Sequence, residues 1–273
     1  SEYNHPAPSD YAAECVPMLA AFAAQQDWDG IFLFDYHASN GDWDRDRISS
    51  YFSIDSNPSK IAFMPTAAAI FRRADVAPAA ASAVMTFPIK QIPDELRTHG
   101  ANIARAWQAL GLSPRDTMDT RTSVRFSDNA DRSAIARNAG YRPVTSAPSV
   151  PFVPHVTWEC DKGKEAEAAF IINSPASRGI IGFASARTTK LGGLTIEPTG
   201  DADHFVAIAA IALDGKPLER SKHILISAVG RVENTGMVWN EDRTSVGNKW
   251  GSAPAIAEGI AARITLATTT TSA

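Results

Sequence analysis

Polar side chains of the kinds that enzymes use stand together at two places in the first 40 residues. The group "EYNH", residues 2–5, comes just before two prolines, and "DYH", residues 35–37, directly follows the apolar run Ile31–Phe34. In folds that repeat a strand and a helix, functional groups collect where strands end and loops begin. If residues 2–3 end a strand as Ile31–Phe34 does, both groups lie on one rim.

The composition of this rim is typical of sugar recognition. Two indoles and three loop acids stand close by in sequence: Trp28, Trp43, Asp42, Asp44 and Asp46. Aromatic rings cover the apolar face of a pyranose, and carboxylates and amides bond its hydroxyl groups. We therefore expect a carbohydrate ligand, with these side chains as contacts: Asn4, His5, Trp28, Asp35, Tyr36, His37 and Trp43.

Glu2 is the residue of the rim that could attack a glycosidic bond. Hydrolysis of that bond needs two carboxyl groups that flank it, one as acid and one as nucleophile or base. Simpler alternatives remain open for both acids of the rim. Glu2 could be a solvated acid near a chain end, and Asp35 could cap a strand or form an ion pair.

A second polar and aromatic stretch lies in residues 230–260, where four residues form a second candidate sugar-contact loop: Trp239, Asn240, Glu241 and Trp250. The alternative is a structural loop that packs over a sheet edge or against the N-terminal part. Long ordered loops are often functional, but packing loops are also common.

Other chemistries lack their sequence signatures. No G-x-S-x-G elbow is present, so an esterase of small acyl esters has little support. The chain has no phosphate-binding loop, no dinucleotide fingerprint and no zinc spacing among its six histidines. The acidic loop after His37 lacks the ligand alternation of an EF-hand. We therefore expect no cofactor and no metal.

Composition bounds the partners. The 273 residues are 44% hydrophobic and 21% charged, with a net charge of -4 and no basic stripe. This balance argues against nucleic acid and anionic membranes as partners. No apolar run is long enough to span a membrane, and no basic-then-apolar leader is visible. The compartment stays open, and a periplasmic or secreted location of the full-length form is compatible with the sequence.

The first segment, residues 1–76, has the pattern of a βα repeat. An Ala-rich stretch, 10–26, predicts a helix. Ile31–Phe34 has no polar alternation, which indicates a strand buried on both faces. Residues 57–73 predict a second helix, with Asn57 as N-cap, Pro58 at its first position and a break near Pro65.

The remaining two segments differ from the first. Residues 77–147 read as a connector with one helix, 92–110, beside short extended pieces at 84–89 and 122–126. Residues 148–273 contain about seven short apolar runs separated by turns, among them Gly192-Gly193 and Asp214-Gly215. Short strands without long helices predict an antiparallel β-sandwich. The expected fold is therefore α+β and multidomain: a partial (β/α) barrel segment followed by that sandwich.

Longer stretches of the sequence resemble a known family. "SEYNHPAPSDYAAECVPMLAAFAAQQDWDGIFLFDYH" and "FSIDSNPSKIAFMPTAAAIFRR" are similar to the last quarter of the (β/α)8 barrel in large bacterial glycoside hydrolases of the retaining clan A type. "AVGRVENTGMVWNEDRTSVGNKWGSAPAIAEGI" resembles the β-rich domain that follows their barrel. The similarity extends over nearly the whole chain and is weakest in the connector.

The resemblance implies that Glu2 is the nucleophile, at the end of the seventh barrel strand. It also implies an acid/base glutamate at the end of the fourth strand, which this chain does not contain. One carboxylate cannot serve both roles. We therefore expect a glycosidase that needs a partner, either an upstream barrel polypeptide or further copies of this chain. The alternative is a non-catalytic carbohydrate-binding or accessory module.

Overall fold

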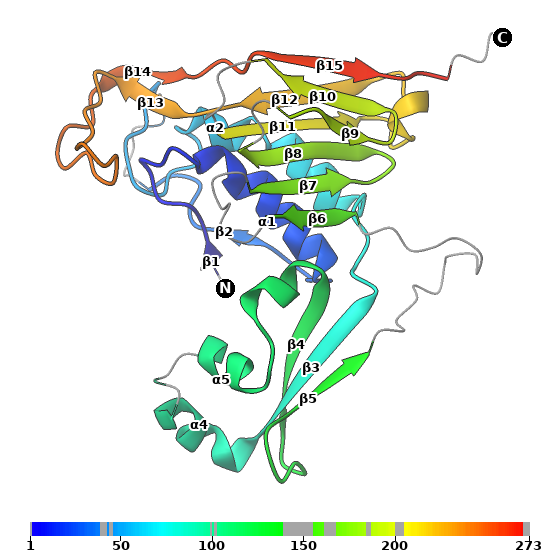
Figure 1. The fold of residues 1–273 in the computed structure, drawn as a ribbon. Coiled ribbons are helices and arrows are strands. Elements are labelled where there is room, and N and C mark those ends of the chain that lie inside the picture. Colours follow the sequence, from blue (N-terminus) through cyan, green and yellow to red (C-terminus); the bar gives the residue numbers. More distant parts are fainter. Residues whose placement is uncertain are drawn as a thin grey trace.

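The computed structural model describes residues 2–38, 43, 46–98, 100, 103–138, 155–160, 168–183, 187–199 and 205–269. It is a mixed α+β fold with short helices and mostly antiparallel sheets (Figure 1). No sheet among these residues closes into a barrel. Within the same part of the chain, no helix is long and apolar enough to cross a membrane.

The N-terminal segment has the predicted order of strand, helix, strand and helix. Its elements are β1 (Glu2–Tyr3), η1 (Ala12–Glu14), α1 (Cys15–Gln25), β2 (Phe32–Leu33), α2 (Pro58–Ile61), α3 (Met64–Ala67) and η2 (Ala68–Arg72). The Asn57 side chain accepts a hydrogen bond from the Ser59 amide, which confirms the predicted N-cap. The expected second helix is broken between α2 and α3, next to Pro65, which is the second residue of α3.

One sequence expectation about β2 is wrong. We expected burial on both faces, but Phe32, Phe34 and Tyr36 are 68%, 40% and 60% exposed. The residues between them, Leu33 and Asp35, are partly buried. The exposed and the partly buried residues alternate, so one side of the strand faces the protein and the other faces solvent. Parallel strands are normally covered on both faces.

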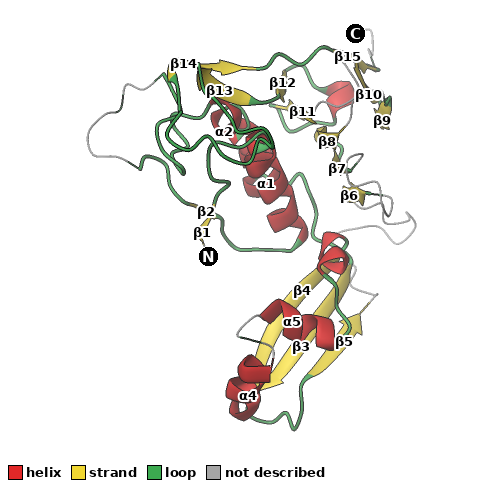
Figure 2. Ribbon diagram, turned by 60° about the vertical axis from the view of Figure 1, so that its left-hand side comes forward, coloured by secondary structure: helices red, strands yellow, loops and turns green. Residues whose placement is uncertain are grey.

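The middle segment is richer than the connector that the sequence suggested. It contains β3 (Ala81–Pro88), η3 (Ile89–Gln91), α4 (Ile92–Thr98), α5 (Ile103–Ala109), η4 (Pro114–Met118), β4 (Thr120–Ser127) and β5 (Ala134–Asn138). The expected helix 92–110 is thus two helices. They pack on the β4-β3-β5 sheet around Met85, Phe87 and Leu112. This unit projects away from the rest of the molecule (Figure 2).

The C-terminal segment consists of short strands, as predicted. They are β6 (Val156–Glu159), β7 (Ala169–Asn173), β8 (Ser177–Phe183), β9 (Thr189–Leu191), β10 (Leu194–Pro198), β11 (Phe205–Ala212), β12 (Ile224–Val229), β13 (Val232–Thr235), β14 (Ser252–Ala257) and β15 (Ala262–Leu266), with the short η6 (Leu218–Arg220). Antiparallel sheets of order β12-β11-β8-β7-β6 and β15-β10-β9 share an apolar core, which fits the expected β-sandwich. Gly192, at the predicted turn between β9 and β10, has φ of +56°.

The five-stranded sheet has two covered faces. One packs on the three-stranded sheet through Ile180, Ile208 and Leu194. The other packs on the N-terminal helices, where Val16 and Phe63 meet Phe170. A single core therefore joins the first and third segments, and the helices that support β1 and β2 are anchored on the C-terminal sheet (Figures 1 and 2).

Candidate functional site

The ends of β1 and β2 form the rim that the sequence predicts. The two strands are parallel, with Glu2 opposite Phe32 and Tyr3 opposite Leu33, and the Phe34 amide continues the pairing by donating to the Tyr3 carbonyl at 3.1 Å. The chain after Tyr3 and the chain after Phe34 therefore leave the sheet side by side. Of Glu2, the structure describes the backbone within β1.

Asn4 holds this rim together. Its amide nitrogen donates to the carbonyl of Phe34 and, at 2.6 Å, to that of Phe52. Its amide oxygen accepts from Lys60 Nζ at 2.6 Å. The predicted sugar contact at Asn4 stays a prediction, and the structure shows that both ends of this side chain already bind protein groups.

Lys60 is a charged residue that the sequence did not reveal as part of the site. It is 0% exposed, and its ammonium also donates to the His5 carbonyl at 2.7 Å. Burial lowers the pKa of Lys60 and raises the pKa of the neighbouring Cys15 thiol. Lys60 follows Ser59 in "NPSK", in the first turn of the helix that the sequence predicts. A lysine at such a position is usually exposed, so no sequence signal marked Lys60 as part of the site.

His5 links two further ionisable groups behind the rim. Its Nε2 lies 2.7 Å from the Tyr3 hydroxyl, and its Nδ1 lies 3.5 Å from the Glu14 carboxylate. Burial and the Lys60 charge lower the pKa of His5. Burial raises the pKa of Glu14 to about 7 and, with the charges of Cys15 and Glu14, that of Tyr3 to about 12. Tyr3 and His5 are thus predominantly uncharged near neutral pH, whereas Glu14 changes its charge in this range.

Glu14 makes stability depend on pH, and Glu14→Gln tests this. Because its pKa is raised in the folded state, its contribution to the free energy of unfolding is full below about pH 4.5 and is lost as pH rises through about 7. We expect Glu14→Gln to match the parent at pH 4 and to exceed its stability by about 2 kcal/mol at pH 8. Urea unfolding at a series of pH values measures this difference.

Glu241→Gln is the matched control for Glu14→Gln, since it removes the same charge from an exposed position. Its stability should follow the parent at every pH. A Glu14→Gln curve that stays parallel to the parent between pH 4 and pH 8 would show that Glu14 does not titrate in this range.

The side chains after β2 form the most open part of the rim. Trp43 stacks on His37 with ring centroids 3.8 Å apart and planes 13° apart, and remains 63% exposed. His37 Nδ1 lies 2.5 Å from Asp55 Oδ2, which fixes the imidazole below the indole. One oxygen of Asp35 is buried and has no hydrogen-bond partner within the described part of the chain. Such an orphaned acceptor is costly to the fold. Because the atom is buried, the contact predicted between Asp35 and a sugar stays a prediction.

The structure does not bring every predicted contact to this rim. Trp28 precedes β2, whereas Asp35–His37 follow it. Trp28 lines a pocket with Asp29, Ile31 and Phe32, and Asp35, Tyr36 and His37 are not among the residues of that pocket. Asp42 and Asp44 lie outside the described residues, and Asp46 uses its carbonyl to accept from the Ala255 amide.

The second candidate loop is held by contacts within the protein. Trp239 donates its indole N–H to Glu233 at 3.0 Å, and the Arg243 guanidinium lies 4.8 Å from the centre of its ring. Arg243 in turn binds Asp10 through two hydrogen bonds of 2.8 Å. Trp250 packs edge-on against Tyr51, with ring centroids 5.2 Å apart. These contacts favour the packing alternative.

The remaining two residues of that loop differ from each other. Asn240 accepts hydrogen bonds from the amides of Thr244 and Ser245, at 2.8 and 3.0 Å, and so closes a turn. Glu241 is exposed. The sugar contacts predicted for this loop stay predictions, with Asn240 and Glu241 the two exposed residues of the four.

Asn234 fastens the rim to the C-terminal segment, and its removal should be costly. It is 3% exposed, accepts from the Ile48 amide at 2.7 Å, and donates to the carbonyls of Ile48 and Trp250 at 2.8 and 2.9 Å. We expect Asn234→Ala to lower the free energy of unfolding by about 2–4 kcal/mol, because three buried backbone groups lose their partner. Equilibrium urea unfolding measures it.

Asn234→Asp serves as the partner variant, since it keeps the acceptor but sets an oxygen against two carbonyls. It should destabilise the fold as well. Asn240→Ala, whose hydrogen bonds lie on the exposed surface, should cost less than about 1 kcal/mol. If Asn234→Ala cost no more than Asn240→Ala, the tie between the rim and the C-terminal segment would be weak.

The interpretation of the site rests on its geometry, because the comparisons with known proteins found no match. No family model, curated protein or solved structure matches the chain. No group of three or more histidine, cysteine, aspartate or glutamate side chains in the described ranges could hold a metal ion. What the rim offers to a ligand is the exposed indole of Trp43 and the exposed phenol of Tyr36.

Proposed function

We propose that this chain acts on or binds carbohydrate, and that it takes part in retaining hydrolysis of an O-glycosidic bond with Glu2 as the nucleophile. The observation that supports this most is the parallel pairing of β1 and β2, which sets Glu2 one strand away from the Asp35–His37 group. In an (β/α) barrel, the carboxyl ends of neighbouring strands are where catalytic groups collect.

The chemistry of the rim suits a sugar ring. Trp43 has one face on His37 and is largely exposed, so a pyranose can stack on its open side. The Tyr36 phenol, 60% exposed, can donate a hydrogen bond to a sugar hydroxyl or accept one. These groups need no cofactor or metal for the proposed reaction.

In the proposed mechanism, the Glu2 carboxylate attacks the anomeric carbon and the glycosidic oxygen leaves with a proton from a second carboxyl group. Water then attacks the glycosyl–Glu2 ester, and the second group takes its proton. We place this second carboxyl group on another polypeptide. The uncovered face of β2, with Phe32 and Phe34 exposed, is the surface that such a polypeptide would cover.

Covalent trapping tests the role of Glu2. A 2-deoxy-2-fluoro glycoside with a good leaving group slows the second step of a retaining reaction, so the glycosyl ester accumulates. We expect mass spectrometry of the digested protein to find the added sugar on the peptide that contains Glu2. Labelling of another carboxylate, with none on this peptide, would overturn the assignment.

Light scattering tests the requirement for a partner. Four copies of the βα pair contain eight strands, the number that closes a barrel of this type, so a tetramer is the expected closed form of the isolated chain. A monomer at micromolar concentration would exclude self-assembly and leave a separate polypeptide as the partner. Full activity of that monomer would contradict the need for a second carboxyl group from outside.

A further inference from the structure

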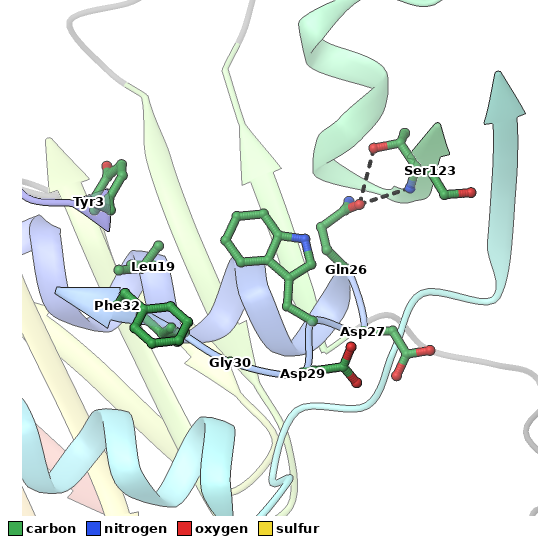
Figure 3. A pocket seen from close by; sticks show the side chains of 11 residues that line it. Tyr3, Leu19, Gln26, Asp27, Asp29, Gly30, Phe32 and Ser123 are labelled. Carbon is green, nitrogen blue, oxygen red and sulfur yellow. Dashed lines mark hydrogen bonds between the residues drawn. The ribbon is translucent and has the colours of Figure 1, made fainter. Parts of the chain in front are cut away.

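A pocket lies beside β1 and β2, on the side of the turn that precedes β2. It has a volume of about 470 Å³ and is lined by the turn after α1, the start of β2 and the start of β4 (Figure 3). Tyr3, Trp28 and Phe32 supply three aromatic rings to its wall, and Asp29 supplies a carboxylate. Pockets that combine apolar rings with a few polar groups are the usual sites of small ligands.

The wall of this pocket is built rigidly. Gln26, 4% exposed, donates to the carbonyls of Thr117 and Thr120 at 2.7 and 2.8 Å, and accepts from the Thr122 amide at 2.8 Å. These bonds fasten the turn after α1 to β4, and two dashed hydrogen bonds run from Gln26 in Figure 3. The pocket is therefore a fixed feature of the fold at the junction of two segments.

Trp28 is fixed but accessible. Its ring packs edge-on against Phe22, with centroids 5.8 Å apart and planes 87° apart, and it remains 46% exposed. Phe32, on the same pocket, is 68% exposed. With nearly half of its surface exposed, the indole can serve as a platform for a flat apolar ligand face.

The two acids of the turn differ in their partners. Asp27 forms an ion pair with Arg121. Asp29 is exposed and forms no hydrogen bond or ion pair within the described part of the chain. A carboxylate without a partner beside an aromatic platform can accept two hydroxyl protons from one ligand.

We infer that this pocket is a second carbohydrate-binding site, in which a pyranose stacks on Trp28 and bonds its hydroxyls to Asp29. The choice of a sugar rests on the proposed function, whereas the pocket itself does not. Two residues of the pocket wall adjoin Glu2, since Phe32 pairs with Glu2 and Tyr3 follows it in the chain, so a sugar held here lies beside the strand that carries the proposed nucleophile. Trp28 thus has a binding role separate from that of Trp43.

Indole N–H signals in a nitrogen-15 NMR spectrum report this binding residue by residue, since the chain has six tryptophans. The probes are the methyl glycosides of glucose, galactose, mannose and xylose, titrated one at a time. We expect one of them to shift the Trp28 signal with saturation in the millimolar range, as befits a ligand of few atoms.

Three variants separate binding from folding. Trp28→Ala should weaken binding of that sugar at the pocket at least about tenfold, read from the Phe32 amide signal. Asp29→Asn should weaken it about threefold or more without affecting stability, because the residue is exposed. Phe126→Ala removes an equally exposed aromatic ring of β4 outside the pocket and should leave the affinity unchanged.

The outcomes distinguish this site from the proposed catalytic function. Sugar shifts at Trp43 alone, or no shift at either indole, would overturn the second site. Shifts at Trp28 caused by tetramethylammonium but by none of the sugars would also overturn it, in favour of a cation pocket. Saturable sugar shifts at Trp28 together with failure to trap a glycosyl ester on Glu2 would support the site and refute the catalytic proposal.

Discussion

Replacing Glu2 by glutamine should reduce hydrolysis of an aryl glycoside by at least about 10³-fold in the assembled, active form of the protein. Glutamine keeps the size of the side chain but removes the charge that forms the glycosyl ester. Sugar binding should persist, because the ring platforms and Asp35 are unchanged. The measurements are initial rates for hydrolysis and the Trp43 indole shift for binding.

Two further variants make the test of Glu2 specific. Glu197→Gln removes a carboxylate from β10 in the three-stranded sheet and should leave the rate unchanged. Glu2→Ala should regain turnover in the presence of azide, because a small anion can attack the anomeric carbon in the space that the side chain vacates. Undiminished hydrolysis by Glu2→Gln would favour the accessory-module alternative, in which another protein performs the catalysis.

Helix starts and turns of this fold could be predicted wherever a short stretch of sequence determines them. Asn57 and Pro58 begin a helix because the amide side chain caps it and proline fits its first turn. Gly192 and Gly215 stand at turns with positive φ, which glycine adopts without steric cost. Most strands of the C-terminal segment could likewise be predicted, because each coincides with a short apolar run between turns.

The covering of β2 could not be read from the sequence. An apolar run without alternation predicts burial on both faces, but burial depends on layers that the run does not encode. Phe32 and Phe34 are exposed because neither the helices nor the C-terminal sheets lie over their face. Large apolar side chains such as these are typical of a strand that is covered on both sides. Their exposure is the physical basis for proposing a partner there.

The candidate site was predictable in part. The pairing of β1 with β2 confirms that residues 2–5 and 35–37 leave one sheet edge. Lys60 and Glu14 could not be found, because their importance arises from contacts with residues distant in sequence. Trp28 was assigned to the rim from proximity in sequence alone, but it lines a pocket that does not include Asp35.

Asn4→Ala should be the most destabilising single change at the rim, lowering the free energy of unfolding by about 3–5 kcal/mol. The variant deprives the Phe34 and Phe52 carbonyls of their donor and leaves Lys60 with only the His5 carbonyl of its two oxygen acceptors. A fully buried ammonium that loses an acceptor is costly, since no water replaces it. Urea unfolding at pH 7 measures the loss.

A double-mutant cycle with Lys60→Met shows how much of this cost comes from the buried charge. Methionine has a similar length but no charge, so the Asn4 oxygen then has no cation to satisfy. We expect Asn4→Ala to cost at least about 1 kcal/mol less in the Lys60→Met background than in the parent. Equal costs in the two backgrounds would mean that Asn4 acts only through the Phe34 and Phe52 carbonyls. A reduced cost would identify Asn4 as the group that lets a buried lysine support the strand carrying Glu2.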